Sequence, residues 1–190
     1  EKKFKLINVA FQIIEKLGWQ KFSLKRLADE EKISIDEIYQ IFKKKEDILK
    51  EFSSMIDLQV EKNFDFKDLE NSSTKDNLFE LIMLRLELMR PYKKALKNII
   101  LVFRSNLSMI KSVSFKILNS LDFYLELTNA YDGSFFDIFK KKAIFFIYTQ
   151  TFVVWINDDS EEMSKTMSEL DKMLSFSEKI TNSFNDYFPI

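Results

Sequence analysis

Only two glycines and two prolines occur among the 190 residues of this chain, and this scarcity constrains the fold more than any other feature. Glycine and proline supply the tight turns that connect strands, so a sheet protein of this length needs more of them. The one Asp-Gly pair, Asp132-Gly133, lies between two segments with helical periodicity and not between alternating strands. We therefore predict an all-α fold of about nine helices.

The composition also limits the chemistry that the chain can perform. Histidine and cysteine are both absent, which excludes thiol nucleophiles, disulfides, Cys/His zinc sites and Ser-His-Asp triads. Two glycines, Gly18 and Gly133, are too few for a phosphate-binding loop or a dinucleotide fingerprint. No carboxylate spacing indicates a metal site. We therefore expect a protein that is not an enzyme, with no catalytic residues, no cofactor and no metal.

The longest apolar run, residues 143–156, decides the expected location of the protein. It is too short to span a bilayer, and it carries Thr149, Gln150 and Thr151 at its centre. No secretory signal is visible. Because 46% of all residues are hydrophobic, the run is better explained as a helix inside a sizeable core. We expect a cytoplasmic protein without an integral membrane segment.

The first fifty residues have the periodicity of short helices separated by polar turns. Apolar residues recur every three or four positions over residues 4–17, and Gly18 follows where a left-handed cap is needed. Ser23 is placed to cap a second helix that starts at residue 24. Ser34 can cap a third helix through Phe42, and Glu37 completes a capping box there.

Longer helical segments fill the rest of the chain. A fourth helix is predicted to start at Glu46, after the lysines at 43–45, and residues 63–76 are the clearest linker. The remaining predicted helices cover residues 77–90, 92–104, 109–129 and 135–157, followed by a last amphipathic helix that Ser160 caps.

Several short motifs follow one another through the first fifty residues. They are Ala10-Phe11, Leu17-Gly18-Trp19, Phe22-Ser23-Leu24, Leu27-Ala28, Ile33-Ser34, Ile38-Tyr39, Phe42 and Lys45-Glu46-Asp47-Ile48-Leu49. In this order and register they resemble the helix-turn-helix domain of the TetR family of bacterial regulators. The resemblance implies a DNA-binding domain over residues 1–52 and a helical ligand-binding and dimerisation domain over residues 53–190.

The second half of the chain resembles more specialised members of the same family. Residues 77–83, 89–93 and 155–160, followed by Thr166-Met167 and Leu170-Asp171, are similar to alphaproteobacterial TetR-like proteins. This half also looks like the TetR-like lipid-binding proteins that assist ubiquinone biosynthesis. The resemblance therefore implies two functions, a transcriptional regulator or a lipid-binding accessory protein without DNA binding.

If the resemblance holds for function, the third helix enters the major groove of double-stranded DNA. Lys25 and Tyr39 would contact phosphates, Gln40 is the best base reader, and Lys45 would add charge at the start of the fourth helix. The candidate DNA-binding residues are Ser23, Lys25, Ser34, Ile35, Asp36, Glu37, Tyr39, Gln40, Lys43, Lys44 and Lys45. A solvated turn is an equally good interpretation of the three consecutive lysines.

The start of the third helix departs from the family pattern. Ile35, Asp36 and Glu37 stand where the family usually has a basic or small residue, then glycine, then threonine or a similar residue. Two carboxylates near phosphates would be repelled, and acceptance from cytosine N4 is a rarer contact. Residues 1–52 contain twelve Lys/Arg against ten Asp/Glu, which is a thin surplus for a DNA-binding domain.

The second domain offers a predicted dimer interface and a predicted ligand pocket. A helix over residues 135–157 that is apolar all round must be buried on every side, by a second copy of the chain or within a monomeric core. The candidate interface residues are Phe145, Phe152, Val153, Trp155, Met167, Leu170 and Leu174. Polar residues within apolar stretches, which have structural roles in most proteins, are the candidate pocket residues: Arg104, Tyr124, Tyr148, Gln150 and Thr151.

These patterns together favour a homodimeric TetR-type regulator, a repressor that binds an operator and is released by a small apolar effector. The alternative is a lipid- or isoprenoid-binding accessory protein of the ubiquinone-biosynthesis type. The residues at the start of the third helix are the ones that separate the two functions.

Overall fold

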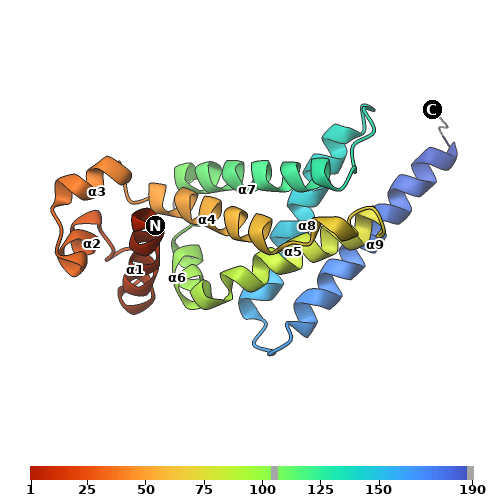
Figure 1. Ribbon diagram of the computed structural model, residues 1–190. Coiled ribbons are helices and arrows are strands. Elements are labelled where there is room, and N and C mark those ends of the chain that lie inside the picture. The colour runs from red at the N-terminus through yellow and green to blue at the C-terminus, as the bar shows by residue number, and fades with distance from the viewer. Residues whose placement is uncertain (104–106, 188–190) are drawn as a thin grey trace. The chain divides into compact units, whose positions relative to one another are not determined.

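The computed structural model describes residues 1–103 and 107–187, and in these ranges the chain forms nine α-helices, two short 3-10 helices and no strand (Figure 1). The predicted all-α fold is confirmed. Two compact units are present. Unit 1 consists of Glu1–Glu61 and Leu88–Ile117, and unit 2 consists of Lys62–Glu87 and Leu118–Ile190. Each unit has its own hydrophobic core and is described separately.

Unit 1 begins with α1 (Lys2–Leu17), two residues earlier than the periodicity predicts. Its buried face includes Ile7, Phe11 and Ile14, as a helical spacing of three and four residues requires. Gly18 ends the helix, and its N–H donates to the carbonyl of Ile14 at 2.8 Å. The φ of Gly18 is +80°, but its ψ of 158° lies outside the left-handed helical region, so the cap is more extended than we predicted.

Two short helices, α2 (Leu24–Glu31) and α3 (Ile35–Ile41), follow in unit 1, and both caps agree with the prediction. The Ser23 hydroxyl accepts from the Arg26 N–H at 3.2 Å. The Ser34 hydroxyl accepts from the Glu37 N–H at 3.2 Å, while the Glu37 carboxylate accepts from the Ser34 N–H. These reciprocal bonds satisfy amide groups that the first turn of a helix leaves without partners.

The helix α4 (Asp47–Asn63) starts one residue later than predicted. The Asp47 carboxylate accepts from the backbone N–H groups of Lys43 and Lys44 at 3.0 and 3.1 Å. These two hydrogen bonds stabilise the turn between α3 and α4. Ile48, Phe52, Met55 and the other apolar residues of its inner face are buried.

Unit 1 is completed by α6 (Lys93–Phe103), which packs along α1 and follows a short 3-10 helix, η2 (Arg90–Tyr92). The Tyr92 ring lies edge-on to Phe11 and Phe52, and its hydroxyl donates to Asn8 at 2.7 Å. The Asn98 amide donates to the carbonyls of Ile14 and Glu15 at 3.1 and 3.2 Å. Asn98 thus satisfies carbonyl groups that the end of α1 leaves free.

Unit 2 contains most of α5 (Thr74–Met89), the second part of α7 (Leu107–Leu127), and all of α8 (Asp137–Asn157) and α9 (Ser164–Tyr187). Helices α8 and α9 pack against each other. The predicted linker contains η1 (Phe66–Asp68), and α5 begins three residues before the predicted start because Ser73 accepts from the Asp76 N–H at 3.1 Å. The core of this unit includes Leu81, Leu86, Leu121, Ile147, Trp155 and Leu170.

The start of α9 differs from the prediction, because Asp158 and not Ser160 is its main anchor. Asp158 is 2% exposed, and its two carboxylate oxygens accept from the N–H and hydroxyl groups of Ser160 and Thr166 at 2.6–3.1 Å. The Ser160 hydroxyl accepts from the Ser164 N–H at 3.0 Å. Burial acts to raise the pKa of Asp158, but these hydrogen bonds outweigh it and hold that pKa well below its usual range.

Candidate functional site

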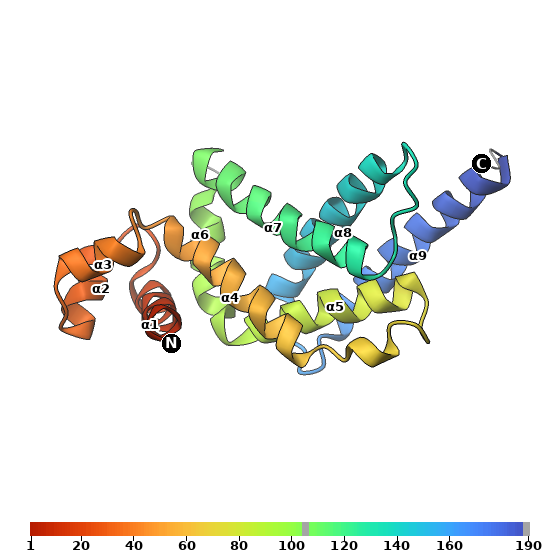
Figure 2. The same ribbon diagram turned by 45° about the horizontal axis from the view of Figure 1, so that its top comes forward.

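The α2–turn–α3 segment has the geometry of a helix-turn-helix, as Figure 2 shows for α1 to α3. Lys32 reverses the chain in a left-handed conformation with φ +54° and ψ +40°, and Ser34 then starts α3. Buried Leu27, Ala28 and Ile38 hold the two helices together. Because these apolar side chains occupy the inner faces, the polar side chains of α3 are left facing solvent.

The exposed surface of α3 carries several of the predicted DNA-binding residues. Ser34, Asp36 and Gln40 are exposed, and the Tyr39 side chain is 46% exposed although it is a large aromatic group. Ile35 is half-buried, so only part of its side chain can contact a ligand. An exposed tyrosine hydroxyl and an exposed glutamine can respectively donate to a phosphate and bond to a base edge.

Glu37 is neutralised by a residue that the sequence analysis did not single out. The Lys2 ammonium lies 2.7 Å from the Glu37 carboxylate, so a residue of α1 pairs with a residue of α3. The Lys2 hydrogen bond and then the Ser34 N–H hold the pKa of Glu37 below its usual value. Two further lysines of α1 act in the same way, because Lys3 pairs with Glu51 and Lys5 pairs with Glu31.

Asp36 has no such neutralising partner. It is exposed, and within the ranges that the structure describes it forms no ion pair. The predicted acidic start of α3 is therefore reduced to one free carboxylate. A single exposed charge costs less near phosphates than two, and salt screens it.

Of the three lysines between α3 and α4, two bond to other residues of the chain and one does not. The Lys45 ammonium lies 5.0 Å from the centre of the Trp19 ring and donates to the Trp19 carbonyl at 3.4 Å. Lys43 donates to the Tyr39 carbonyl at 2.9 Å. Lys44 is exposed, and its ammonium has no hydrogen-bond or ion-pair partner among the described residues.

The role that we expected for Lys45 as a phosphate contact stays a prediction, although its ammonium already contacts Trp19. The Asp47 carboxylate accepts from the N–H groups of Lys43 and Lys44 in the turn before α4, and it adds a negative charge to the first turn of that helix. Lys44, in the turn before α4, and Lys25, on α2, are both exposed. Ser23 is half-buried, and its hydroxyl accepts the N-cap bond of α2.

The predicted dimer interface is also divided by burial. Val153 and Met167 are 53% and 41% exposed, and Phe145 and Phe152 are half-buried. The other three residues in this set are fully buried inside unit 2, so they have no surface to offer to a partner: Trp155, Leu170 and Leu174. The apolar sequence of α8 suggested burial on every side. Within the single chain, however, one side of this helix is exposed.

One face of α8 is exposed along its whole length. Phe139, Phe146 and Val153 recur there at intervals of seven residues, and each of their side chains is more than half exposed. A spacing of seven residues places side chains on the same side of a helix. Large apolar side chains that line up on an exposed face are typical of a surface that another protein surface covers.

The predicted ligand-pocket residues occupy other places. Tyr124, Tyr148 and Thr151 are buried, and Tyr148 accepts from the guanidinium Nε of the buried Arg85 at 3.2 Å. Gln150 is exposed on α8, and Arg104 lies outside the described residues. Unit 2 contains a cavity of about 500 Å³, but the predicted residues do not line it. Its lining comes from four helices, so no stretch of sequence shows it.

Neither a metal site nor a membrane span is found where the structure describes the chain. No three His, Cys, Asp or Glu residues there come together in a way that could hold a metal ion. No described helix combines the length and apolar character needed to cross a bilayer.

Comparisons with known proteins agree with this fold. No protein-family model matches the chain, and no curated protein matches it. Among solved structures, the chain is similar to the TetR transcriptional regulator from Nitrosomonas europaea ATCC 19718, with 17% sequence identity and a TM-score of 0.75. The match covers 93% of this chain and 97% of that one. The predicted TetR-like fold is therefore confirmed.

Proposed function

We propose that this protein is a TetR-type DNA-binding transcriptional regulator. The observation that carries the proposal is the exposed surface of α3, where Tyr39 and Gln40 face solvent while Lys2 neutralises Glu37. Lys25 and Lys44 supply positive charge on the neighbouring helix and turn. Phosphate contacts from these lysines provide affinity, and Gln40 provides a contact to a base edge.

In this proposal the protein acts as a cytoplasmic homodimer. The exposed faces of α8 and α9, with Phe146, Val153 and Met167, form the contact between two copies. Two copies related by a two-fold axis present two α3 helices to an operator with two half-sites. A small apolar effector that binds in unit 2 changes the spacing of the two α3 helices and releases the operator, so the protein acts as a repressor.

A second candidate function is a TetR-like lipid-binding accessory protein without DNA binding. Asp36 favours it, because an exposed carboxylate at the start of α3 repels phosphates. The contact of Lys45 with Trp19 favours it as well, because it removes one of the expected phosphate contacts.

Binding to random double-stranded DNA at low salt separates the two functions. A regulator binds it with an affinity that falls steeply as salt increases, because phosphate contacts release counterions. The accessory protein shows no binding at any salt concentration, and apolar lipid is extracted from the purified protein. Absence of DNA binding at low salt contradicts the regulator.

A further inference from the structure

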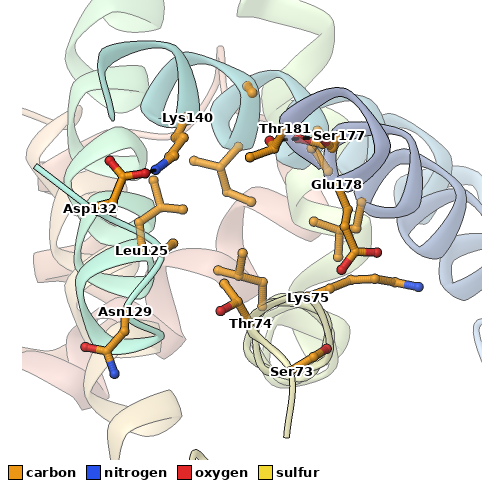
Figure 3. Close-up of a pocket in the computed structure, with 16 residues that line it drawn as sticks. Ser73, Thr74, Lys75, Leu125, Asn129, Asp132, Lys140, Ser177, Glu178 and Thr181 are labelled. Atoms are coloured by element: carbon orange, nitrogen blue, oxygen red, sulfur yellow. Dashed lines mark hydrogen bonds and ion pairs between the residues drawn. The ribbon is translucent and has the colours of Figure 1, made fainter. Parts of the chain in front are cut away.

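The cavity in unit 2 has the size and the composition of a small-molecule site. Its volume of about 500 Å³ falls within the range of roughly 300–1,000 Å³ that ligand sites occupy. It is lined by residues from the start of α5 and the residue before it, the end of α7 and the segment that follows it, the first half of α8 and the second half of α9. Figure 3 shows the labelled polar side chains arranged around an open centre.

The inner wall of the cavity is apolar. Leu78, Leu125, Ile144, Ile147 and Leu174 line it, and each is almost fully buried. They leave room for an aliphatic chain, and transfer of such a chain from water to this wall lowers the free energy. A fully polar ligand does not match this surface.

The four charged residues that line the cavity, Lys75, Lys140, Asp132 and Glu178, have no net charge, and both lysines are already paired. Lys140 lies 2.8 Å from the Asp132 carboxylate and 3.0 Å from that of Asp137. Lys75 lies 2.9 Å from the carboxylate of Asp171, and Glu178 adds a further negative charge beside it.

An anionic group would therefore compete with the carboxylates that already hold the lysines. A cationic group could approach Glu178, but Glu178 lies beside Lys75 and already interacts with its charge, so Lys75 would repel that group. Taking a charge out of water without a free partner is costly. The site favours an uncharged head group.

The hydroxyl groups of the lining decide which kind of uncharged head group fits. Thr74 donates its hydroxyl hydrogen to the carbonyl of Thr128 at 3.3 Å, and Thr181 donates to the carbonyl of Ser177 at 3.1 Å. Ser73 donates to the Asp76 carboxylate at 2.7 Å. Because carbonyls and carboxylates only accept, these hydrogens are committed, and each oxygen retains a lone pair that accepts. A ligand that donates hydrogen bonds completes them.

We propose that this cavity binds an uncharged aliphatic alcohol, with the chain against the buried leucines and isoleucines and the hydroxyl donating its one hydrogen to the oxygen of the half-buried Thr181. Such a ligand meets the apolar wall, the balanced charge and the accepting oxygens at once. If the protein is the proposed regulator, this alcohol is its effector. Binding of the alcohol to the cavity does not itself depend on that function.

Titration calorimetry with four probes of equal chain length tests the class of ligand. The probes are 1-decanol, 1-methoxydecane, decanoate and decylammonium. We expect 1-decanol to bind at least about tenfold more tightly than the two charged probes. The ether accepts but cannot donate, so we expect it to bind about fivefold more weakly than the alcohol.

Four substitutions test where the ligand binds. Ala143 lines the cavity on α8, and Ala143→Phe fills the space, so binding of 1-decanol should be lost. Asn119→Phe adds the same ring to an exposed position of α7 outside the cavity and should leave binding unchanged. Thr181→Val keeps the side-chain shape and removes the accepting oxygen, so it should weaken 1-decanol binding about fivefold. Thr74→Val makes the same change at an exposed position across the cavity and should leave binding unchanged.

Two results overturn the inference. Tighter binding of decanoate or decylammonium than of 1-decanol contradicts the uncharged ligand, and unchanged binding in a folded Ala143→Phe variant contradicts this cavity. A DNA-binding titration on the same preparation separates this inference from the proposed function. Protein that binds DNA but no probe contradicts only the cavity, and protein that binds 1-decanol but no DNA contradicts only the regulator.

Discussion

At the scale of single residues, the arrangement of charge around α3 decides whether the surface can approach DNA. Lys2 pairs with the Glu37 carboxylate and offsets its charge in part, whereas Asp36 is exposed and has no ion-pair partner among the described residues. Lys45 is held by Trp19, whereas Lys44 remains available. Among the predicted DNA-binding residues, Asp36 is the carboxylate without an ion-pair partner where the structure describes the chain, and Lys25 and Lys44 are exposed lysines, so we expect this surface to attract phosphates.

Replacement of Lys44 tests the assignment of the phosphate contact. Lys44→Ala should weaken binding to all DNA sequences alike and lower the slope of log affinity against log salt by about one unit, because one counterion fewer is released. Lys62→Ala, at the other end of α4, should leave the slope unchanged. A loss confined to one base position of the DNA would show that Lys44 reads a base instead.

Replacement of Asp36 tests the remaining repulsion. Asp36→Asn removes one negative charge from the exposed start of α3, so we expect tighter binding to all DNA at low salt and a smaller gain at high salt. Glu37→Gln keeps a capping box but breaks the ion pair with Lys2, so it should lower the melting temperature slightly. Weaker DNA binding by Asp36→Asn would show that this carboxylate accepts from a base.

The contrast between caps and ion pairs shows how far the sequence alone predicts this site. Ser23, Ser34 and Glu37 were predicted correctly because a cap depends on residues three positions apart. The partners of Lys2 and Lys45 were missed because they are 35 and 26 positions away. Only the packing of the helices brings such residues together.

At the scale of elements, the sequence again predicts local features of unit 2 but not the features that depend on how its helices pack. Helical periodicity predicted α7 and α8 to within two residues at each end. The cavity was not predicted, because its lining residues come from four helices. The buried Asp158 was also missed as the anchor of α9, because it lies six residues before the first helical residue.

The anchor of α9 makes the stability of unit 2 sensitive to acid. The pKa of Asp158 is lower in the folded protein than in the unfolded chain, where it is about 3.9. The stabilisation is therefore complete above that value and is lost as pH falls below it. We expect unfolding by urea to need progressively less denaturant below about pH 4.

Replacement of Asp158 separates this effect from general acid denaturation. Asp158→Asn places an amide against groups that only need an acceptor, and it should lower the free energy of unfolding by about 1–3 kcal/mol at pH 7. Its loss of stability below pH 4 should be smaller than that of the wild type. An unchanged midpoint at pH 7 would show that Asp158 is not the anchor.

At the scale of the whole molecule, the proposed function needs two copies of the chain. Phe139, Phe146 and Val153 expose apolar surface on one face of α8. Association of two copies would remove this surface from water, which favours a dimer. The sequence predicted an apolar α8 correctly, but it could not show which side remains exposed after the chain folds.

Charged residues on this face should give a folded monomer. Phe146→Glu and Val153→Glu place a carboxylate on the proposed contact, and because both positions are exposed, folding of the single chain is unaffected. Sedimentation at micromolar concentration should show a dimer for the wild type and a monomer for both variants. Phe123→Glu, which removes an exposed ring from α7, is the control and should remain dimeric. A monomeric wild type would contradict the proposed assembly.

Selection of bound sequences from a random pool of double-stranded DNA by the purified wild-type protein is the most direct test of the central claim. The proposed regulator should enrich a palindromic site whose two half-sites are centred one helical turn apart, about 10 base pairs, or a multiple of it. Enrichment should be lost when Gln40 and Tyr39 are both replaced with alanine. A pool that stays random after repeated selection at low salt would contradict the claim that this fold reads DNA.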